Sequence, residues 1–391
     1  MGSDLPVLKP ERYLSEVLMY NVNIIMSVYN GEAYIRDQID SILRSTVSNW
    51  KLYIFDDGSS DSSREIANEY AEKYKGKIFA VNNHRNMGST LSFLYNLNRV
   101  AKRNRENEKI KITNAYVRKF KKPITAKLKG IISLKDSAVR FVKKPHFTRN
   151  TIKCSEYYMF CDQDDSWLMD KIFLTVKKMK ALERIKGKHK PCMVFTDAIL
   201  VDENLKFLEK SFYQTNHMKA GKCDLAHLLM ENKAIGCTVA INQAAADLLA
   251  ESFPSAENNY RFRNDYDYIR YHDWWMALIC ASFGAVKFYH VPTVMYRQHS
   301  ANQVGQTDFK SYIKNRAADR EGIRRRINAT IEQAECFYRC YGSVMKKRKL
   351  KVLKHFIKLN EYSPIVRRMI MFRYGFFKSG FIRNVALLLS I

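Results

Sequence analysis

Aspartate is concentrated in one short stretch of the chain, Phe160-Cys161-Asp162-Gln163-Asp164-Asp165-Ser166-Trp167. Three carboxylates occupy four positions there, directly after the apolar run 157–160, which has the composition of a buried strand. Carboxylates at the end of a buried strand are costly to desolvate unless positive charge compensates them. Because Mg²⁺ and Mn²⁺ prefer hard oxygen ligands, a divalent cation fits this role. The Asp-x-Asp spacing therefore predicts a metal site, although a single such motif is weak evidence.

Polar residues follow two other apolar runs that have the length of strands, 23–28 and 51–55. In an open parallel α/β sheet, the carboxyl ends of the strands form the edge at which ligands bind. The residues expected together at this edge are Ser27, Tyr29 and Asn30, then Asp56 and Asp57, then Asp162 to Asp165. Taken alone, Asp56 and Asp57 also fit a turn held by hydrogen bonds from side chain to backbone. The series along three strands favours a shared binding site for Asp57, and the turn for Asp56.

The order of elements predicts the sheet that such a site needs. Apolar spacing predicts strands at 23–28, 51–55, 78–81, 157–160 and 193–196, and helices that begin near residues 35, 62, 89 and 172. Ser62-x-x-Glu65 has the pattern of a capping box at one helix start. Alternating strands and helices favour a mostly parallel sheet with right-handed crossovers. The third helix is expected to end near residue 100, where a basic segment interrupts the alternation.

The net charge of +27 is concentrated in two segments. Residues 101–150 contain 16 Lys/Arg against 3 Asp/Glu, and residues 309–391 contain 20 against 5, so the rest of the chain is nearly neutral. Unless they are only solvated faces, such segments favour a polyanionic partner, either nucleic acid or an anionic membrane surface. Over 346–358 and 372–389 the cations alternate with apolar residues, a pattern typical of helices that lie in a membrane interface.

Composition excludes several classes of protein. With 46% hydrophobic and 13% aromatic residues, the chain is not a disordered protein. The longest apolar run, 274–286, is too short to span a bilayer and predicts a buried helix. The first twenty residues lack the pattern of a signal peptide, and the eight scattered cysteines fit a reduced, cytoplasmic protein better than a zinc site.

Seven segments, in order along the chain, resemble those of the family 2 nucleotide-sugar glycosyltransferases, which have the GT-A fold. They are IIMSVYNGEAYIRDQIDSIL, LYIFDDGSSDSS, NHRNMGS, YMFCDQDDSWLMDKI, GCTVAIN, HDWWMALICASFG and YRQHSANQVG. The resemblance covers residues 22–305 apart from 101–150, and the last three segments are most similar to the bacterial rhamnosyltransferase-type subgroup. It implies an α/β chain with a Rossmann-like, mostly parallel sheet flanked by helices, a basic insertion and a basic helical C-terminal extension.

The resemblance also implies an organisation by segment. In order, the expected segments are a lead-in (1–21) and a GT-A domain (22–308) made of a nucleotide-sugar-binding half (22–100 and 151–215), a basic insertion (101–150) and an acceptor-binding half (216–308), followed by a membrane-associating region (309–391).

Residue roles carried over from the resemblance fall into three groups. The nucleotide-sugar site is expected to contain Ser27, Tyr29, Asn30, Asp57, Asp162, Gln163, Asp165 and Arg297, with Ser27 and Asp57 at the base and Arg297 as a clamp on the diphosphate. Asp162 and Asp164 would hold Mg²⁺ or Mn²⁺, together with His299 unless that residue is an ordinary loop side chain. The sugar and acceptor pocket is expected to contain Trp167, Gly236, Cys237, Thr238, His272, Trp274 and Trp275, with at most one of the adjacent tryptophans facing the core.

Asp273 matches the general base of the family. Such a base takes the proton of the acceptor hydroxyl as its oxygen attacks the anomeric carbon, and direct displacement inverts that centre. The alternative is that Asp273 only caps the helix that it opens.

The expected function is an inverting, metal-dependent transferase that moves a sugar, with rhamnose favoured by the subgroup, from a dTDP- or UDP-sugar to a lipid-linked or growing polysaccharide acceptor in bacterial cell-surface glycan synthesis. The enzyme is expected in the cytoplasm, peripheral on the inner face of the cell membrane. One alternative is a UDP-hexose or UDP-N-acetylhexosamine transferase of the same fold. Alternatives of other classes are a metal-dependent nuclease and a catalytically silent membrane scaffold. Nucleic acid is not the expected partner, because aromatic residues do not interleave the basic runs.

Overall fold

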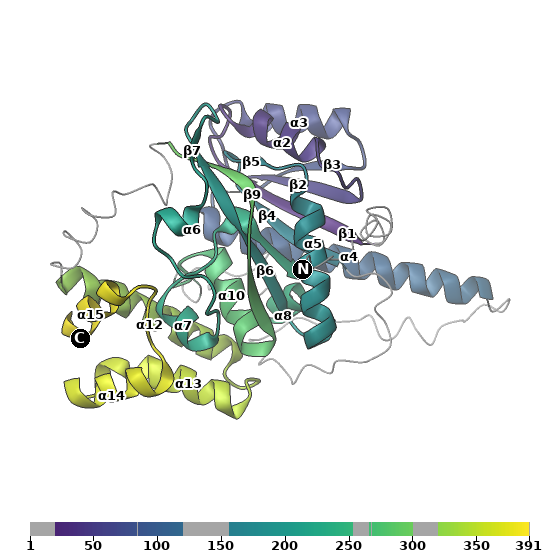
Figure 1. Ribbon diagram of the computed structural model, residues 1–391. Coiled ribbons are helices and arrows are strands. Elements are labelled where there is room, and N and C mark those ends of the chain that lie inside the picture. Colours follow the sequence, from purple (N-terminus) through teal and green to yellow (C-terminus); the bar gives the residue numbers. More distant parts are fainter. Residues whose placement is uncertain are drawn as a thin grey trace, which may run out of the picture.

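The apolar runs of the sequence form one curved sheet with helices against both faces (Figure 1). In this computed structural model, residues 20–83, 85–119, 156–252, 266, 268–299 and 320–390 are described, with 107–119 described by backbone alone. The strands are β1 (Asn21–Val28), β2 (Trp50–Asp56), β3 (Ile78–Asn82), β4 (Glu156–Cys161), β5 (Ser166–Trp167), β6 (Cys192–Val201), β7 (Phe207–Glu209), β8 (Val239–Asn242) and β9 (Ala285–Arg297).

The strands follow the spatial order β3-β2-β1-β4-β8-β6-β9-β5, with β7 beside β6. Strands β1 to β4 are mutually parallel, and β8 runs antiparallel to both of its neighbours, β4 and β6. On the far side of β8, β6 is parallel to β9, and β5 is antiparallel to β9. The expected α/β architecture with a mostly parallel sheet is confirmed.

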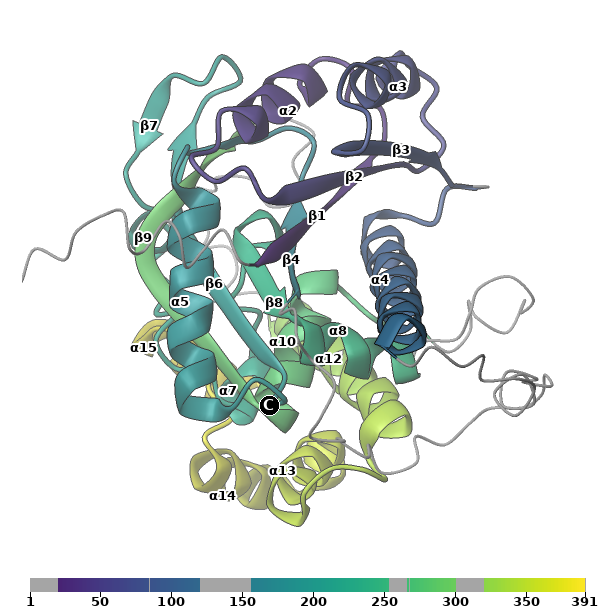
Figure 2. The ribbon, with the colours of Figure 1, turned by 90° about the vertical axis from the view of Figure 1, so that its right-hand side faces the viewer.

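Helices cover the two faces of the sheet (Figure 2). The helices that precede the C-terminal region are α2 (Ile35–Leu43), α3 (Ser63–Lys73), α4 (Ser89–Lys119), α5 (Lys171–Lys186), α6 (Phe212–Thr215), α7 (Leu225–Met230), α8 (Gln243–Ser252) and α10 (His272–Phe283), with the 3-10 turn η2 (Gly236–Thr238). Helices α2 and α3 lie on one face of the β1–β3 part of the sheet, and α4 lies on the other (Figure 2).

Burial on both faces explains the composition of the central strands. Ile24, Ile25 and Met26 in β1 and Met159 and Phe160 in β4 are all at most 1% exposed. A strand enclosed on both sides needs apolar residues at consecutive positions, which is why these runs lack the alternation of a half-exposed strand. The carboxylates that directly follow β4 therefore lie at the edge of a closed core.

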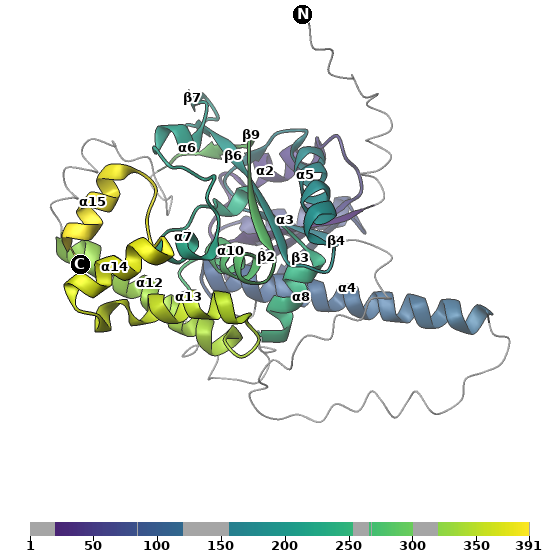
Figure 3. The same cartoon turned by 60° about the horizontal axis from the view of Figure 1, so that its bottom comes forward.

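The C-terminal region consists of α12 (Arg320–Tyr341), α13 (Lys347–Ile357), η3 (Lys358–Glu361), α14 (Pro364–Tyr374) and α15 (Phe381–Ser390). These helices gather beside α7 and α10 (Figure 3). Phe337 and Tyr341 of α12 are fully buried, and their rings pack against Trp275 of α10. Among the helices described here, none is long and apolar enough to cross a membrane.

Two details of the sequence interpretation were wrong. Helix α4 does not end near residue 100 but continues to Lys119, so the first part of the basic segment extends a helix of the body; residues 120–155 lie outside the described part of the chain. The capping box does not form, because the Ser62 side chain makes no cap hydrogen bond to α3. Instead the backbone N–H of Ser63 donates to Asp61 Oδ1 at 3.0 Å.

The apolar side of α13 also differs from expectation. Leu353 and Phe356 were expected to face a membrane interface, but both are fully buried, and α13 packs on α7 and α12. The physical reason is that the helix is strongly amphipathic, so its apolar side completes the protein core and only its cations, such as Lys347 and Lys351, remain exposed.

A buried polar network joins α5 to the sheet and gives a test of the fold. Asn242 Nδ2 donates to Glu183 Oε1 at 2.8 Å and to the Lys190 carbonyl at 2.9 Å, and the Cys192 N–H donates to Asn242 Oδ1 at 2.9 Å. Tyr157 donates to the second oxygen of the same Glu183 carboxylate at 2.8 Å. Asn242, Glu183, Tyr157 and Cys192 are all buried, so each depends on its partner.

Asn242→Ala should lower the free energy of unfolding by about 3 kcal/mol, because several buried groups lose a partner and each costs about 1–3 kcal/mol. Asn204→Ala, at an exposed loop position, should change it by less than about 0.5 kcal/mol. Urea unfolding of both variants measures this through the midpoint at a constant slope. Equal stabilities of the two variants would show that the network is not stabilising.

Candidate active site

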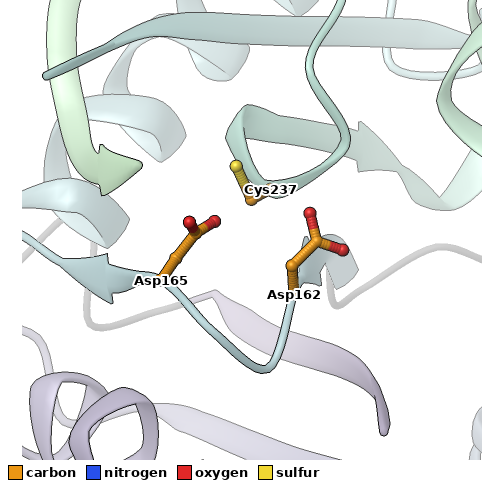
Figure 4. Close-up of side chains that lie close together, drawn as sticks. All are labelled: Asp162, Asp165 and Cys237. Atoms are coloured by element: carbon orange, nitrogen blue, oxygen red, sulfur yellow. The ribbon is translucent and has the colours of Figure 1, made fainter. Parts of the chain in front are cut away.

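The carboxylate stretch forms a loop between β4 and β5 at the carboxyl edge of the sheet. Asp162, Asp165 and Cys237 point toward one another across this loop and η2 (Figure 4). One ligand atom from each of these three residues lies within 4.8 Å of the others. The loop therefore brings two carboxylates and one thiol to a single point, as Figure 4 shows.

Arg297, the last residue of β9, fixes the shape of this loop. Its backbone N–H donates to Asp165 Oδ1 at 3.1 Å, and its Nε donates to the Asp164 carbonyl at 2.7 Å. The guanidinium also pairs with Asp37 at 3.0 Å and donates to the Glu203 carbonyl. Because the side chain is only 2% exposed and fully engaged by protein acceptors, the structure assigns Arg297 to holding the loop, in place of the expected diphosphate clamp.

Asp164 lies on the other side of the loop and faces His299. Nε2 of His299 is 2.9 Å from Asp164 Oδ2, and the imidazole ring stacks on Tyr34 with 5.1 Å between centroids. The structure thus pairs two of the three residues that the sequence predicted as metal ligands, Asp164 and His299, whereas the third, Asp162, lies with Asp165 and Cys237.

The charges of the cluster repel one another strongly. Burial, and then the neighbouring charges of Asp164 and Asp273, raise the pKa of Asp162 to about 8. Burial, with Asp164 and Asp162, holds the pKa of Asp165 well above its usual range. Oδ2 of Asp165 is buried without a hydrogen-bond partner. Carboxylates in this state are stabilised by a cation, so the oxygen atoms fit a hard divalent metal ion.

Cys237 and Lys171 are two other titratable residues next to the carboxylates. Burial raises the pKa of the Cys237 thiol well above its ordinary value, so it remains protonated and is a poor ligand for a hard cation. Burial lowers the pKa of Lys171 to about 8; its ammonium lies over the Trp167 ring at 4.7 Å and donates to Thr293 at 3.4 Å. Trp167 itself is 4% exposed, so its expected place in the sugar pocket is largely closed off.

Asp273 is the second residue of α10 and lies next to the cluster. Its Oδ1 accepts hydrogen bonds from Asn232 Nδ2 at 3.0 Å and from the Trp274 N–H at 2.6 Å. Burial raises the pKa of Asp273 to about 7, although these hydrogen bonds oppose the shift. A carboxyl group with this pKa is half ionised at neutral pH, as a general base requires.

Gly236 connects Asp273 to the cluster, and His272 packs beneath it. A Cβ atom at Gly236 would lie 2.8 Å from His272 Nε2 and 3.8 Å from Asp273 Oδ2, so only glycine fits there. The next residue, Cys237, belongs to the carboxylate cluster. His272 stacks on Phe93 at 4.0 Å between centroids, and burial lowers its pKa to about 3, so its ring is neutral. The fully buried Thr238 donates to the Ile235 carbonyl at 2.8 Å and shapes the η2 turn.

Trp274 and Trp275 are both buried, whereas the sequence analysis expected at most one of them to face the core. Trp274 is 5% and Trp275 1% exposed. Trp274 donates its indole N–H to the Leu228 carbonyl at 2.5 Å, whereas Trp275 packs on α12. Both are buried because α7 and α12 enclose α10 from two directions, so neither presents a free face to an acceptor.

The residues expected at the nucleotide base form a polar chain across β1 and β2. Ser27 Oγ donates to Ser92 Oγ at 2.7 Å, and Asn83 Nδ2 donates to both Ser92 at 3.3 Å and Asp57 Oδ1 at 2.8 Å. Asp57 Oδ2 accepts the backbone N–H groups of Met87 and Gly88 at 3.0 and 2.9 Å. Burial raises the pKa of Asp57 despite these donors.

Asp56 has the turn role that was favoured for it. Its Oδ1 accepts the Ser59 N–H at 3.3 Å, and its Oδ2 pairs with Arg64 at 3.2 Å.

Gln163 joins the loop after β1 to the loop after β4. Its Oε1 accepts the Tyr29 N–H at 2.7 Å, and its Nε2 donates to the Tyr29 carbonyl at 3.0 Å. The Tyr29 side chain is 51% exposed, which leaves its ring accessible at the edge. Asn30 accepts the Ser60 N–H at 2.9 Å and so links the same loop to the turn after β2.

Three contributors were missed by the sequence analysis: Asn232, Lys171 and Asn83. Asn83 and Lys171 lie within the segments NHRNMGS and YMFCDQDDSWLMDKI but were given no role there, whereas Asn232 lies outside all seven segments. Each of the three reaches the site through a tertiary contact.

Comparisons with known proteins find one family match and several similar chains. Residues 23–99 match the family described as glycosyl transferase family 2. The chain is 24% identical over 295 residues to the dTDP-rhamnosyl transferase RfbG of Shigella flexneri, which covers 74% of this chain and 77% of RfbG. It is 39% identical over 61 residues to the minor teichoic acid biosynthesis protein GgaB of Bacillus subtilis, with 15% of this chain and 7% of GgaB covered.

Several matches cover only part of the relative. For EpsE, a Bacillus subtilis protein that bears a glycosyltransferase name, the match is 38% identical over 65 residues and spans 23% of its length. Among solved structures, TarS 1-349 of S. aureus aligns over 95% of this chain and 90% of that chain, with 12% identity and a TM-score of 0.41. The family match spans β1 to the start of α4, and the RfbG alignment extends the relationship over most of the chain. Residues 23–99 are therefore identified as a glycosyl transferase family 2 segment, and the similarity to RfbG extends over most of the chain.

Proposed function

We propose that this enzyme transfers a sugar from a nucleotide-sugar donor by direct, inverting displacement, with a divalent metal ion at the carboxylate cluster. The observation that carries the proposal is that Asp162 and Asp273, 111 positions apart, lie close enough for the charge of one to raise the pKa of the other. In such a pair, Asp162 would bind a cation and Asp273 would remove a proton.

Asp162 and Asp164 would hold the metal ion, with Asp165 as a further oxygen ligand and His299 beside Asp164. A divalent ion there would neutralise negative charge that develops on the diphosphate leaving group. The residues fit such an ion because the buried Oδ2 of Asp165 has no protein partner and the three aspartates repel one another. Mn²⁺ and Mg²⁺ both suit an oxygen-rich site.

Asp273 acts as the general base in this proposal. Its carboxylate accepts the proton of the acceptor hydroxyl while the hydroxyl oxygen forms the new bond to the anomeric carbon, and the nucleoside diphosphate departs with the electrons of the broken bond. The lack of a side chain at Gly236 lets the η2 turn approach His272 and Asp273 closely. Asn232 positions the carboxylate and favours its ionised form.

The donor is proposed to be a dTDP- or UDP-linked sugar. Ser27 and Asp57 are proposed to face the base, and Tyr29 offers an exposed ring at the same edge. The printed name of RfbG supports rhamnose as the sugar, and a UDP-hexose or UDP-N-acetylhexosamine is the alternative. The acceptor is proposed to be a lipid-linked or growing glycan, with the enzyme peripheral on the cytoplasmic face of the membrane. The nuclease alternative has no support among the matched families and relatives.

A screen of donor hydrolysis tests the function as a whole. Purified protein is incubated with UDP-glucose, UDP-galactose, UDP-N-acetylglucosamine and dTDP-rhamnose, with Mn²⁺, Mg²⁺ or EDTA, and released nucleotide is measured. Metal-dependent turnover of one donor supports the proposal. Turnover of none, in a protein that cleaves nucleic acid, would reject it.

Removing a metal ligand should abolish the contribution of the metal to nucleotide binding. In Asp164→Asn and in Asp165→Asn, the gain in UDP or dTDP affinity on adding Mn²⁺ should fall by more than about tenfold, since each change removes a charged oxygen ligand. Glu209→Gln, on exposed β7, is the matched control and should keep the full gain. Calorimetric titration of UDP or dTDP with and without Mn²⁺ measures this gain in affinity. An undiminished gain in both cluster variants would exclude these residues from the metal site.

Removal of the base should affect transfer and leave donor binding intact. Asp273→Asn should lower the rate of sugar transfer by about 10²–10⁴-fold, which is typical of a positioned general base. Nucleotide affinity should change little, because Asp273 contacts no residue of the expected base site. A transfer rate near that of the unaltered enzyme would contradict the assignment.

Asn232 gives a test by pH. The value of kcat/KM should rise with pH through about 7 as Asp273 loses its proton. Asn232→Ala removes a donor that stabilises the ionised form, so the pKa of Asp273 and the midpoint of the profile should rise by about one pH unit. The size follows because a hydrogen bond to a charged group contributes about 1.5–3 kcal/mol, and 1.36 kcal/mol corresponds to one unit. Asn204→Ala should leave the midpoint in place. An unchanged profile for Asn232→Ala would show that Asn232 does not position the base.

A further inference from the structure

Helices α14 and α15 present an unusual number of exposed apolar side chains. On α14, Ile365, Met369 and Phe372 are 74%, 65% and 64% exposed, and their spacing places them on one side of the helix. On α15, Phe381 and Leu389 are 83% and 63% exposed. Large apolar side chains exposed in this number on two neighbouring segments mark a contact with another phase or molecule. We define the apolar patch as Ile365, Met369, Phe372, Phe381, Ile382, Val385 and Leu389.

The patch belongs to helices that are firmly attached to the protein. The opposite sides of α14 and α15 bury Met371 and Leu387, both at most 1% exposed. Arg368 of α14 donates to the Leu388 carbonyl of α15 at 2.9 Å, which links the two helices. The exposed residues are therefore the outer surface of a packed unit.

Positive charge surrounds the patch. Residues 362–391 contain five Lys/Arg and no Asp/Glu. Next to α14, an open groove of about 400 Å³ runs along α13, with an apolar floor to which Leu350 contributes and with Lys347, Lys351, Lys354, His355, Lys358 and Tyr362 around it. The four lysines recur at helical spacing, so their ammonium groups extend from one side of α13. An apolar surface thus lies beside a cationic groove.

The charge identifies the partner of this surface. A second copy of the chain would bring two cationic surfaces together without any acidic residue from 362–391 to compensate them. An anionic lipid bilayer satisfies both features, because its interior accepts apolar side chains and its headgroups attract lysine and arginine. We infer that α13, α14 and α15 dock on an anionic membrane through the apolar patch and the lysine groove. This inference specifies the membrane contact of the proposed function and rests on that function only for the identity of the acceptor.

The docking surface is tied directly to the acceptor side of the active site. Arg383 of α15 pairs with the buried Glu231, whose Oε2 also accepts the Ser379 N–H at 2.8 Å. Lys233 donates to Ser379 Oγ at 2.5 Å and pairs with Glu231 at 3.2 Å. Glu231 and Lys233 flank Asn232, which holds the Asp273 carboxylate. Docking through α15 would therefore set the height and orientation of the proposed base relative to the bilayer.

The test uses point substitutions in the full chain, because deleting 346–391 would also remove buried core residues such as Phe356 and Phe376. Sedimentation is measured with vesicles of phosphatidylcholine alone and of phosphatidylcholine with phosphatidylglycerol. The unaltered protein should sediment with the anionic vesicles, and less so at high salt. The double variant Phe372→Ser/Phe381→Ser should lose about tenfold or more in partition coefficient, since two large apolar side chains are removed. The triple variant Lys347→Gln/Lys351→Gln/Lys354→Gln should lose the preference for anionic vesicles.

Phe207→Ser is the matched control. Phe207 is 62% exposed on β7, at the top of Figure 1, whereas α13 and α14 lie at the bottom, and this variant should sediment fully. Equal sedimentation of the double and control variants would overturn the inference. So would concentration-dependent dimerisation that the double variant abolishes, since it would identify a second copy as the partner.

Donor hydrolysis, measured in the same samples without vesicles, separates this result from the proposed function. A protein that sediments but turns over no nucleotide sugar would retain the docking surface and lose the proposed function. A protein that turns over the donor but sediments with no vesicle would lose the docking surface alone.

Discussion

Burial of carboxylates at the edge of a closed sheet, reinforced by their mutual repulsion, is the constraint on which the candidate site depends. Asp162, Asp164 and Asp165 follow a strand that is buried on both faces, and Asp273 adds its charge from α10. Water has limited access to this point, so the ionised forms of Asp162, Asp165 and Asp273 are disfavoured and their pKa values rise. A folded chain can keep such a cluster only if rigid neighbours prevent the loop from moving outward into solvent.

Those neighbours are themselves charged, and they act on the backbone of the loop as much as on its side chains. Arg297 reaches across from β9 and binds the Asp164 carbonyl and Asp37, while its own N–H binds Asp165. A buried guanidinium with its donors satisfied is rigid, which keeps the carboxylates in place before any ligand arrives. Lys171 beneath the loop supplies positive charge without reaching the carboxylates as a hydrogen-bond donor. The protein therefore holds the cluster in place without pairing its carboxylates with a cationic side chain, which leaves its oxygen atoms open to a proton or to a bound cation.

The sequence predicted the strands and the convergence of the aspartates because these features are local. Buried strands show as apolar runs, and the carboxyl edge of a parallel sheet follows from the order of elements. The errors came from contacts that no local pattern records. Helix α4 was expected to stop where lysines begin, but cations are compatible with a helix and do not end it. Trp274 and Trp275 were separated into core and pocket because adjacent helical residues point in different directions, yet α7 and α12 cover both directions. Arg297 was expected to bind the diphosphate of the donor. Its position in the sequence does not reveal whether its side chain faces a ligand or, as here, a backbone carbonyl.

Asn232 lies where the connection after α7 meets the C-terminal helix α15. It occupies a short connection after α7, and its neighbours Glu231 and Lys233 are buried because α15 covers them from the C-terminal region. A buried ion pair contributes little net stability, but it permits only one relative placement of the groups that it joins. Here it fixes α15, the connection and the Asp273 carboxylate in a single arrangement. The C-terminal helices therefore help to position the candidate active site. A contact made on the surface of α15 would be transmitted to residues 231–233, the short connection that orients the proposed base Asp273.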